Sequence, residues 1–140
     1  MTFDCGETAG FTDEGDIGFA MKQVLAVDDS ASVRQMVCFT LRNAGYGVTE
    51  AADGQQGLEK ARGQKFDLVI TDLNMPVMGG IEMIAGMRKV AGYSFTPILM
   101  LTTESQQEKK DAGRKAGATG WIVKPFQAEQ LIAVVQKLIP

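Results

Sequence analysis

The sequence predicts an α/β fold in which helices cover both faces of a parallel sheet. Five short apolar runs, of the kind that form buried strands, alternate along the chain with five segments of helical periodicity. Each link between successive apolar runs is too long for a hairpin turn and long enough for a crossover connection. Crossovers place the connecting helices against the two faces of one parallel sheet, which gives a doubly wound α/β domain.

The first strand and helix are predicted just after Met21. The stretch QVLAVDDS begins at Gln23 as a continuous apolar run and ends in two acids, as expected for a strand buried on both faces. Ser30 can cap the helix that follows, in which apolar residues recur at helical spacing. Gly45 then ends this helix, because glycine is favoured just past the last helical turn.

The other elements continue the alternation. Further strands are predicted over 46–51, 66–71, 96–102 and 118–124, from the stretches YGVTEA, FDLVIT, TPILMLT and ATGWIVK. Further helices are predicted over 53–62, 79–90, 105–117 and 127–139. Asp53 opens the first of these helices and Gly63 closes it. The alternation therefore accounts for most of the chain after residue 20.

Composition excludes several classes of function. The chain has 140 residues, of which 45% are hydrophobic and 22% charged, as in an ordinary globular domain. No apolar run reaches the length of a membrane span and no signal peptide is evident, so we expect no membrane insertion. The chain contains no histidine, which excludes histidine-based catalysis, histidine metal ligands and a role as a phosphohistidine donor.

Residues 1–20 differ from the rest of the chain. They contain five acids and no lysine or arginine, are rich in glycine and lack apolar periodicity, so we predict a flexible acidic tail before a domain over 21–140. Two interpretations of this tail stand side by side: an overlong start without a role, and a working segment. The rest of the chain holds 12 acids and 14 bases, a net charge of +2, which is too weak for a nucleic-acid surface.

The two cysteines indicate a reducing environment. Cys5 and Cys38 form no spacing typical of a metal or redox site. Cys38 falls within an apolar helical pattern, so we expect a buried free thiol there. These features favour a cytoplasmic location.

Polar residues stand where four of the predicted strands end. In a doubly wound sheet, function gathers outside the carboxyl ends of the strands. The chain places there the pairs Asp28-Asp29, Thr102-Thr103 and Lys124-Pro125, together with Asp72. Three carboxylates, a hydroxyl and an ammonium group should therefore converge on one rim of the sheet.

This set of groups suits magnesium and phosphate. Three neighbouring carboxylates raise one another's pKa unless a cation intervenes, and their hard oxygen atoms suit Mg²⁺. An Asp72 carboxylate in this setting can act as a nucleophile and accept a phosphoryl group, while Lys124 and Thr102 contact its oxygens. The chain has no nucleotide-binding glycine loop of either common type, so the donor must bring its phosphoryl group without base or ribose recognition.

Each fragment alone has an ordinary structural explanation. An acidic pair after a strand is usually a turn or helix cap, and Asp72 alone could form an Asx turn before Pro76. The joint occurrence at four strand ends favours a magnesium–phosphate site. A phosphatase that uses the same aspartate and Mg²⁺ is a weaker alternative, because it needs a second acid–base carboxylate and a substrate cap, neither of which is evident.

Four motifs carry a resemblance to a known family: AVDDS, DLVITDLNMPVMGGIE, PILMLTTES and GWIVKPF, in this order and over residues 21–140. The chain resembles the receiver domain of bacterial two-component response regulators, and most closely the single-domain chemotaxis regulators of the CheY type. The resemblance implies a flavodoxin-like sheet in the order 2-1-3-4-5. It also implies that Asp72 accepts a phosphoryl group from a histidine kinase.

The resemblance assigns further roles by position. Asp29, Asp72 and the backbone carbonyl of Asn74 would bind Mg²⁺ directly, and Asp28 would act through water. Lys124 would contact the phosphoryl group, preceding a cis bond to Pro125. Thr102 would be the switch hydroxyl, and Gly79-Gly80 would open the third helix beside the site, where a bulky side chain would crowd the loop.

The chain departs from the family pattern at the switch. Trp121 stands where tyrosine or phenylalanine is usual, and Thr103 where alanine is common. The bulkier indole puts the usual inward swing of this ring in doubt. Asn74 and Glu104 occupy positions that tune hydrolysis of the phosphoryl group in the family, and two polar residues there predict a short lifetime.

We expect the output to be a protein contact that phosphorylation strengthens or weakens, since no DNA-binding or enzymatic domain follows in this sequence. The fourth helix, with four cations over 109–115, is either a solvated surface or part of a partner face with the fifth strand and last helix. We therefore predict a monomeric signalling switch rather than an enzyme. A phosphate sink for a kinase is the alternative, which the sequence does not separate from it.

Overall fold

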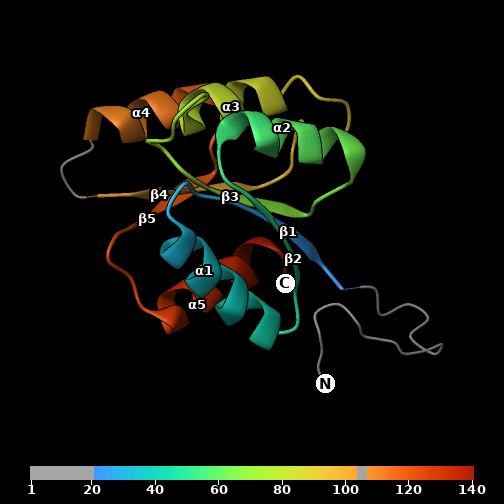
Figure 1. Ribbon diagram of the computed structural model, residues 1–140, viewed down its shortest axis with the longest axis vertical. Helices are drawn as coiled ribbons and strands as arrows, with labels where there is room; N and C mark the ends of the chain where they lie inside the picture. Colours follow the sequence, from blue (N-terminus) through green and yellow to red (C-terminus); the bar gives the residue numbers. More distant parts are fainter. Residues whose placement is uncertain (1–20, 104–106) are drawn as a thin grey trace.

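The computed structural model describes residues 21–103 and 107–140, and these ranges contain five strands that alternate with five helices (Figure 1). The strands are β1 (Gln23–Val27), β2 (Gly47–Ala51), β3 (Leu68–Asp72), β4 (Ile98–Thr102) and β5 (Gly120–Val123). The helices are α1 (Ala31–Asn43), α2 (Gly54–Gly63), α3 (Gly80–Met87), α4 (Gln107–Ala116) and α5 (Ala128–Leu138). The predicted alternation of elements is confirmed.

All pairs of neighbouring strands are parallel, and the sheet has the order β2-β1-β3-β4-β5. Helices α1 and α5 cover one face, whereas α2, α3 and α4 cover the other (Figure 1). The doubly wound, flavodoxin-like fold and the order 2-1-3-4-5 are therefore confirmed. Because β1 and β3 are neighbours at the centre of the sheet, the acids at their carboxyl ends lie side by side.

The side chains of the central strands alternate between two apolar cores. Along β1, Leu25 and Val27 pack toward the α2–α3 side, and Val24 and Ala26 pack toward the α1–α5 side. Strands β3 and β4 alternate in the same way. Burial on both faces explains why these strands are continuous apolar runs, and it makes the sheet a rigid base for the residues at its carboxyl edge.

Two helix ends illustrate how the chain stops an element. Helix α1 ends before Gly45, whose φ of 99° confirms the predicted stop. Helix α3 ends at Met87, so the prediction of a helix to residue 90 was wrong at this end. Beyond Met87 the backbone tightens into i to i+3 hydrogen bonds, and the Arg88 guanidinium donates to the carbonyl oxygens of Tyr93 and Thr96, which turns the chain back toward β4.

Some predictions fall outside the described ranges. The acidic segment 1–20 and residues 104–106, which include the start of the helix predicted over 105–117, lie outside them, so the flexible tail and the domain boundary at residue 21 stay predictions. Within the described ranges, no helix combines the length and apolarity that crossing a bilayer requires.

Candidate functional site

Three carboxylates lie together at the carboxyl edge of the sheet. Asp28 and Asp29 follow β1, and Asp72 is the last residue of β3. One carboxylate oxygen from each lies within 4.8 Å of those of the other two. Asp28 is 2% exposed, Asp72 is half-buried and Asp29 is exposed, so the cluster opens to solvent on the Asp29 side. The structure thus brings together the three acids that the sequence places at strand ends.

Lys124 supplies a positive charge to this cluster from the turn after β5. Its Nζ donates a hydrogen bond to Asp72 Oδ1 at 3.1 Å and forms an ion pair with Asp28 Oδ2 at 3.6 Å. The Lys124–Pro125 peptide is cis, as the family resemblance implies. One ammonium group therefore lies against two carboxylates and offsets part of their repulsion.

Two buried polar atoms at this edge have no hydrogen-bond partner within the described residues: Asp28 Oδ2 and Thr102 Oγ1. Thr102 ends β4 and is 1% exposed. Buried polar atoms are normally paired, and leaving one unpaired costs free energy. Asp28 Oδ2, which among the described residues has only the ion pair with Lys124, can accept a hydrogen bond from a metal-bound water, and the Thr102 hydroxyl can donate one to a phosphoryl oxygen.

The Asp28 carboxyl responds to its surroundings in both directions. Burial raises its pKa above the ordinary value, and the nearby Asp72 and Asp29 raise it further. The Ser30 backbone N–H, which donates to Asp28 Oδ1 at 2.9 Å, and the Lys124 charge lower the pKa. Because burial dominates, an arriving cation would stabilise the ionised form that the protein by itself disfavours.

The cluster fits a magnesium ion. Its donors are carboxylate oxygens, the ligands that Mg²⁺ prefers, and it is open on one side, which suits an ion that keeps several waters. The predicted ligand Asn74 lies two residues after Asp72, and its backbone role stays a prediction. Its side-chain Oδ1 accepts a hydrogen bond from Lys109 on α4, a contact that sequence reasoning missed.

The loop after β3 is tightly turned. The Met78 N–H donates to the Pro76 carbonyl at 2.7 Å, which makes a γ-turn around Val77, whose φ of 67° is rare for a branched residue. A Cβ at Gly80 would lie 2.2 Å from the Asp72 carbonyl oxygen, so only glycine fits there. The absence of a side chain at Gly80 therefore lets α3 begin in close contact with the Asp72 backbone. This agrees with the expectation that a bulky side chain at Gly79-Gly80 would crowd the loop.

Trp121 on β5 lies against α4 and is 38% exposed. The Lys110 ammonium is 5.7 Å and the Arg114 guanidinium 5.3 Å from the centroid of the indole ring, within the range of cation–π contacts. The indole therefore lies at the surface, between β5 and the cations of α4. Glu104, the other predicted tuning residue, lies outside the described ranges.

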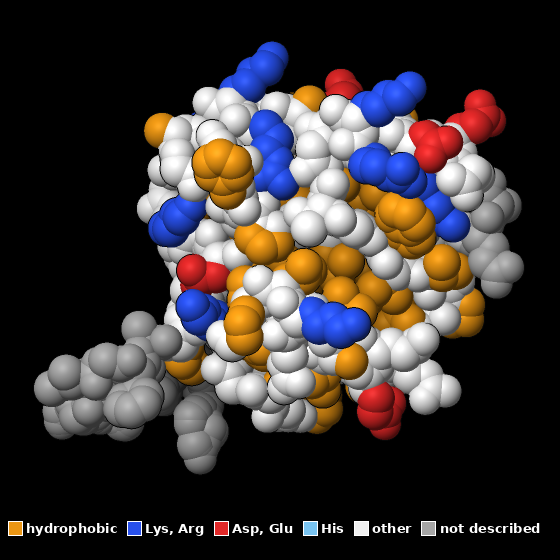
Figure 2. Space-filling model, turned by 180° about the vertical axis from the view of Figure 1, so that it is seen from behind, with side chains coloured by type: hydrophobic (Ala, Val, Ile, Leu, Met, Phe, Trp, Pro, Cys, Tyr) orange, Lys and Arg blue, Asp and Glu red, His pale blue; other side chains and the backbone are white. Residues whose placement is uncertain are grey.

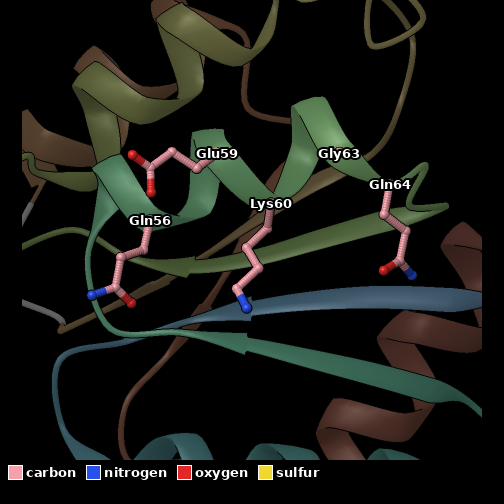
Figure 3. A pocket seen from close by; sticks show the side chains of 5 residues that line it. All are labelled: Gln56, Glu59, Lys60, Gly63 and Gln64. Atoms are coloured by element: carbon pink, nitrogen blue, oxygen red, sulfur yellow. The ribbon is translucent and has the colours of Figure 1, made fainter.

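An open hollow lies elsewhere, on the surface of α2 (Figure 3). Its lining residues all come from α2 and the residue that follows it: Gln56, Glu59, Lys60, Gly63 and Gln64. None of them belongs to the acidic cluster, and the hollow holds no convergent set of chemical groups. We therefore place the functional site at the carboxyl edge of the sheet rather than in this hollow.

The sheet order, the acidic cluster and its lysine together define a receiver domain. The model of the response regulator receiver domain matches residues 24–136, so the chain belongs to this family. That match covers most of the chain and includes every described residue of the acidic cluster.

Individual relatives agree with this assignment. The chain is 54% identical to the structure of chemotaxis response regulator CheY4 of Vibrio cholerae, with a TM-score of 0.81 over 86% of this chain and 100% of that one. It is 29% identical, with a TM-score of 0.80 over 86% and 98% of the two chains, to the receiver domain of sensor histidine kinase PA1611 from Pseudomonas aeruginosa, which has a magnesium ion coordinated in its active site cleft.

A curated relative adds a difference in length. Response regulator ArlR of Staphylococcus aureus is 36% identical over 119 residues, which is 85% of this chain and 53% of the relative. The chain therefore spans about half the length of the curated relatives it matches.

Proposed function

We propose that this chain is a phosphate-accepting switch of a two-component system, in which Asp72 takes a phosphoryl group from a histidine kinase in a Mg²⁺-dependent reaction. The observation that carries the proposal is the cluster of three carboxylates within 4.8 Å, with the Lys124 ammonium bonded to Asp72. The similarity to a receiver domain with magnesium in its cleft supports the choice of metal.

The transfer step is a nucleophilic substitution at phosphorus. A carboxylate oxygen of Asp72 attacks the phosphorus atom of the kinase phosphohistidine and forms a P–O bond. The P–N bond breaks, its electron pair stays on the imidazole nitrogen, and that nitrogen takes up a proton. The products are an acyl phosphate on Asp72 and a free histidine on the kinase.

Four residues of the cluster and its loop would hold the metal: Asp29, Asp72 and the Asn74 backbone carbonyl directly, and Asp28 through water. When bound, Mg²⁺ supplies positive charge against the oxygens of the transferring group. The chain's own cation and hydroxyl complete the arrangement. Lys124 Nζ, now 3.1 Å from Asp72 Oδ1, pairs with a phosphoryl oxygen, and Thr102 Oγ1 donates to another.

The output is a population shift that changes a protein-binding surface made by α4, β5 and α5. The face behind the view of Figure 1 carries apolar side chains between lysines and arginines (Figure 2). On β5 and α4, Trp121 supplies an apolar ring, and Lys110 and Arg114 beside it supply positive charge. The similarity to CheY4 supports a role in chemotaxis. We expect a monomeric cytoplasmic switch that is not an enzyme toward a separate substrate.

Phosphate incorporation from acetyl phosphate tests the nucleophile. We expect the wild-type chain to be labelled only when Mg²⁺ is present, and the Asp72→Asn variant not to be labelled. Asp67→Asn is the matched control, because Asp67 precedes the same strand and bonds to the Gln23 backbone N–H, away from the cluster. Equal labelling of Asp72→Asn and the control would disprove the assignment.

A second measurement separates an output switch from a phosphate sink. Immobilised chain, with and without acetyl phosphate, is exposed to a candidate target and to the phosphorylated kinase. A switch binds its target with an affinity that depends on phosphorylation, whereas a sink only accelerates loss of phosphate from the kinase.

A further inference from the structure

Arg34 joins the acidic edge of the sheet to β2 through α1. Its Nη1 donates to the Asp28 backbone carbonyl at 2.7 Å, and its Nε donates to Glu50 Oε1 on β2 at 2.9 Å. The Arg34 side chain is only 19% exposed. Its planar guanidinium is therefore bound at two separate nitrogens and held in one orientation.

The turn from Asp28 to Ser30 is anchored at several atoms. The Asp28 N–H donates to the Ala51 carbonyl at 3.1 Å, and Asp28 Oδ1 accepts from the Ser30 N–H at 2.9 Å. Arg34 adds the bond to the Asp28 carbonyl. That carbonyl belongs to the peptide group that links Asp28 to Asp29, so Arg34 fixes the plane of this peptide.

Asp29 needs this support more than its neighbours do. Its carboxylate is exposed, and none of the described residues forms a hydrogen bond or an ion pair with it. Asp28 and Asp72, in contrast, are each held by Lys124. The direction of the Asp29 carboxylate therefore depends on the backbone of the turn.

We infer that Arg34 is a positioning residue for the cation at the carboxylate cluster. It acts through the Asp28–Asp29 peptide, which it holds so that Asp29 faces the other two acids. The inference rests on the proposed function, because it assumes that the cluster binds Mg²⁺. The ion pair with Glu50 holds Arg34 itself, so the support runs from β2 through α1 to the acidic edge.

Replacing Arg34 should have two opposite effects on Mg²⁺ affinity, one through its charge and one through its hydrogen bond. Removing a cation near three acids would by itself strengthen Mg²⁺ binding. The Arg34 charge is already paired with Glu50 at 2.9 Å, so little of that effect should reach the cluster. Loss of the bond to the Asp28 carbonyl should dominate, and the loss of such a supporting hydrogen bond weakens metal affinity by about tenfold or more.

The test titrates Mg²⁺ alone into the unphosphorylated full chain and follows binding by backbone NMR shifts. We expect Arg34→Ala to weaken binding about tenfold. Arg34→Lys should recover part of this affinity, because an ammonium group reaches one acceptor but cannot hold two in a fixed fork. Arg42→Ala is the matched control: Arg42 lies on the same helix, pairs with the same Glu50 at 4.0 Å and bonds to the Val48 carbonyl, but does not contact the turn.

Labelling by acetyl phosphate supplies a second readout. Arg34→Ala should raise the Mg²⁺ concentration for half-maximal rate about tenfold, and leave the rate at saturating Mg²⁺ within about twofold of wild type. Wild-type Mg²⁺ affinity in Arg34→Ala, or equal weakening in Arg42→Ala, would overturn the positioning role and leave the proposed function intact. A wild-type chain that binds no Mg²⁺ would overturn both. If Arg34→Ala does not fold, Arg34→Lys alone decides: unchanged affinity there counts against the role.

Discussion

Asp72 is a charged residue at the end of a largely apolar, buried strand. Strand β3 lies between β1 and β4, with Leu68, Val69 and Ile70 buried, and this rigid strand carries the acid out at the edge of the sheet. At this edge Lys124 attracts the Asp72 carboxylate, and the neighbouring carboxylates repel it. The strand therefore fixes the position of the Asp72 carboxylate, and the neighbouring charged groups determine its reactivity.

The balance of charge at Asp72 predicts a metal-dependent stability. Without Mg²⁺ the Asp72→Asn variant should fold and be at least as stable as wild type, because asparagine is nearly isosteric and removes one of three crowded charges. With Mg²⁺ at ten times its Kd, wild type should gain about 1.4 kcal/mol in free energy of unfolding, and the variant much less. Urea denaturation with and without Mg²⁺ measures this. The same gain in both proteins would show that the ion binds elsewhere.

Cys38 predicts a pH dependence that is unrelated to the site. Burial, with a smaller contribution from the Glu50 carboxylate, raises the pKa of the Cys38 thiol from 9.0 to about 11. In the unfolded chain the thiol ionises at the lower value, so its contribution to stability is complete below pH 9 and is lost as the pH rises toward 11.

Chemical denaturation between pH 8 and pH 11 tests this, with Cys38→Ala as reference so that other titrating groups cancel. The stability difference between wild type and Cys38→Ala should shrink above pH 9.

In a Cys5→Ser background, a thiol reagent at pH 8 should react with Cys38 only as fast as the protein opens. Rapid labelling of the folded protein would contradict the buried thiol.

At the scale of elements, glycines set how closely the layers approach. A Cβ at Gly113 on α4 would lie 2.1 Å from Met100 Sδ on β4, and one at Gly86 on α3 would lie 3.1 Å from Leu58 Cδ1 on α2. Helix α4 is otherwise strongly polar, with only Lys110 and Gly113 buried among its described residues, so Gly113 is one of the few positions at which it packs inward. Glycine at this position therefore lets α4 pack closely on the middle of β4.

Gly113→Ala should therefore destabilise the protein by about 1–3 kcal/mol through overpacking against Met100, although alanine is the better helix former. Gly63→Ala is the control, since a Cβ there meets nothing within 4 Å. The control should be neutral or up to about 1 kcal/mol more stable. Denaturant midpoints measure both. A Gly113→Ala variant as stable as the control would mean that the Met100 side chain or α4 shifts without cost.

At the scale of the molecule, the paired strands β4 and β5 link the acidic edge to the proposed output face. Thr102 ends β4 and pairs with Val123 on β5, and Trp121 pairs with Met100 two residues earlier in the same ladder. The indole lies outward, against Lys110 and Arg114 of α4. A displacement of Thr102 toward a phosphoryl group would therefore change the packing around Trp121, which lies two residues away along this ladder.

An inward swing of Trp121 is close to balanced by itself. Burying the exposed part of the ring gains about 1–2 kcal/mol at 25 cal/mol per Å². The cation–π contacts with the exposed Arg114 and the buried Lys110 would be lost, at a cost of about 0.5–1 kcal/mol for the first and about 1–2 kcal/mol for the second. The space that Thr102 leaves must then decide the direction, which makes the swing dependent on phosphorylation.

Fluorescence tests this coupling directly, because Trp121 is the only tryptophan in the chain. A phosphate analogue with Mg²⁺ should lower iodide quenching of the indole, and Thr102→Ala should reduce the change. Equal quenching in both states would mean that the ring is static and that the coupling takes another route.

The local pattern of residues was enough to predict the alternation of elements and the acids at the carboxyl edge. Buried parallel strands are continuous apolar runs, and their carboxyl ends share one edge, so Asp28, Asp29, Asp72, Thr102 and Lys124 could be placed together before any coordinates existed. The order of the strands came instead from the family resemblance, because periodicity does not say which strands are neighbours.

Only the tertiary structure decided the contacts that connect this edge to the helices. The bond from Arg34 to the Asp28 carbonyl, that from Lys109 to Asn74 and the two cations over Trp121 all depend on how a helix is rotated about its axis and how far it lies from the sheet. Those two quantities follow from packing across the whole core, in which residues far apart in the chain meet. A local pattern of polar and apolar residues contains no information about them.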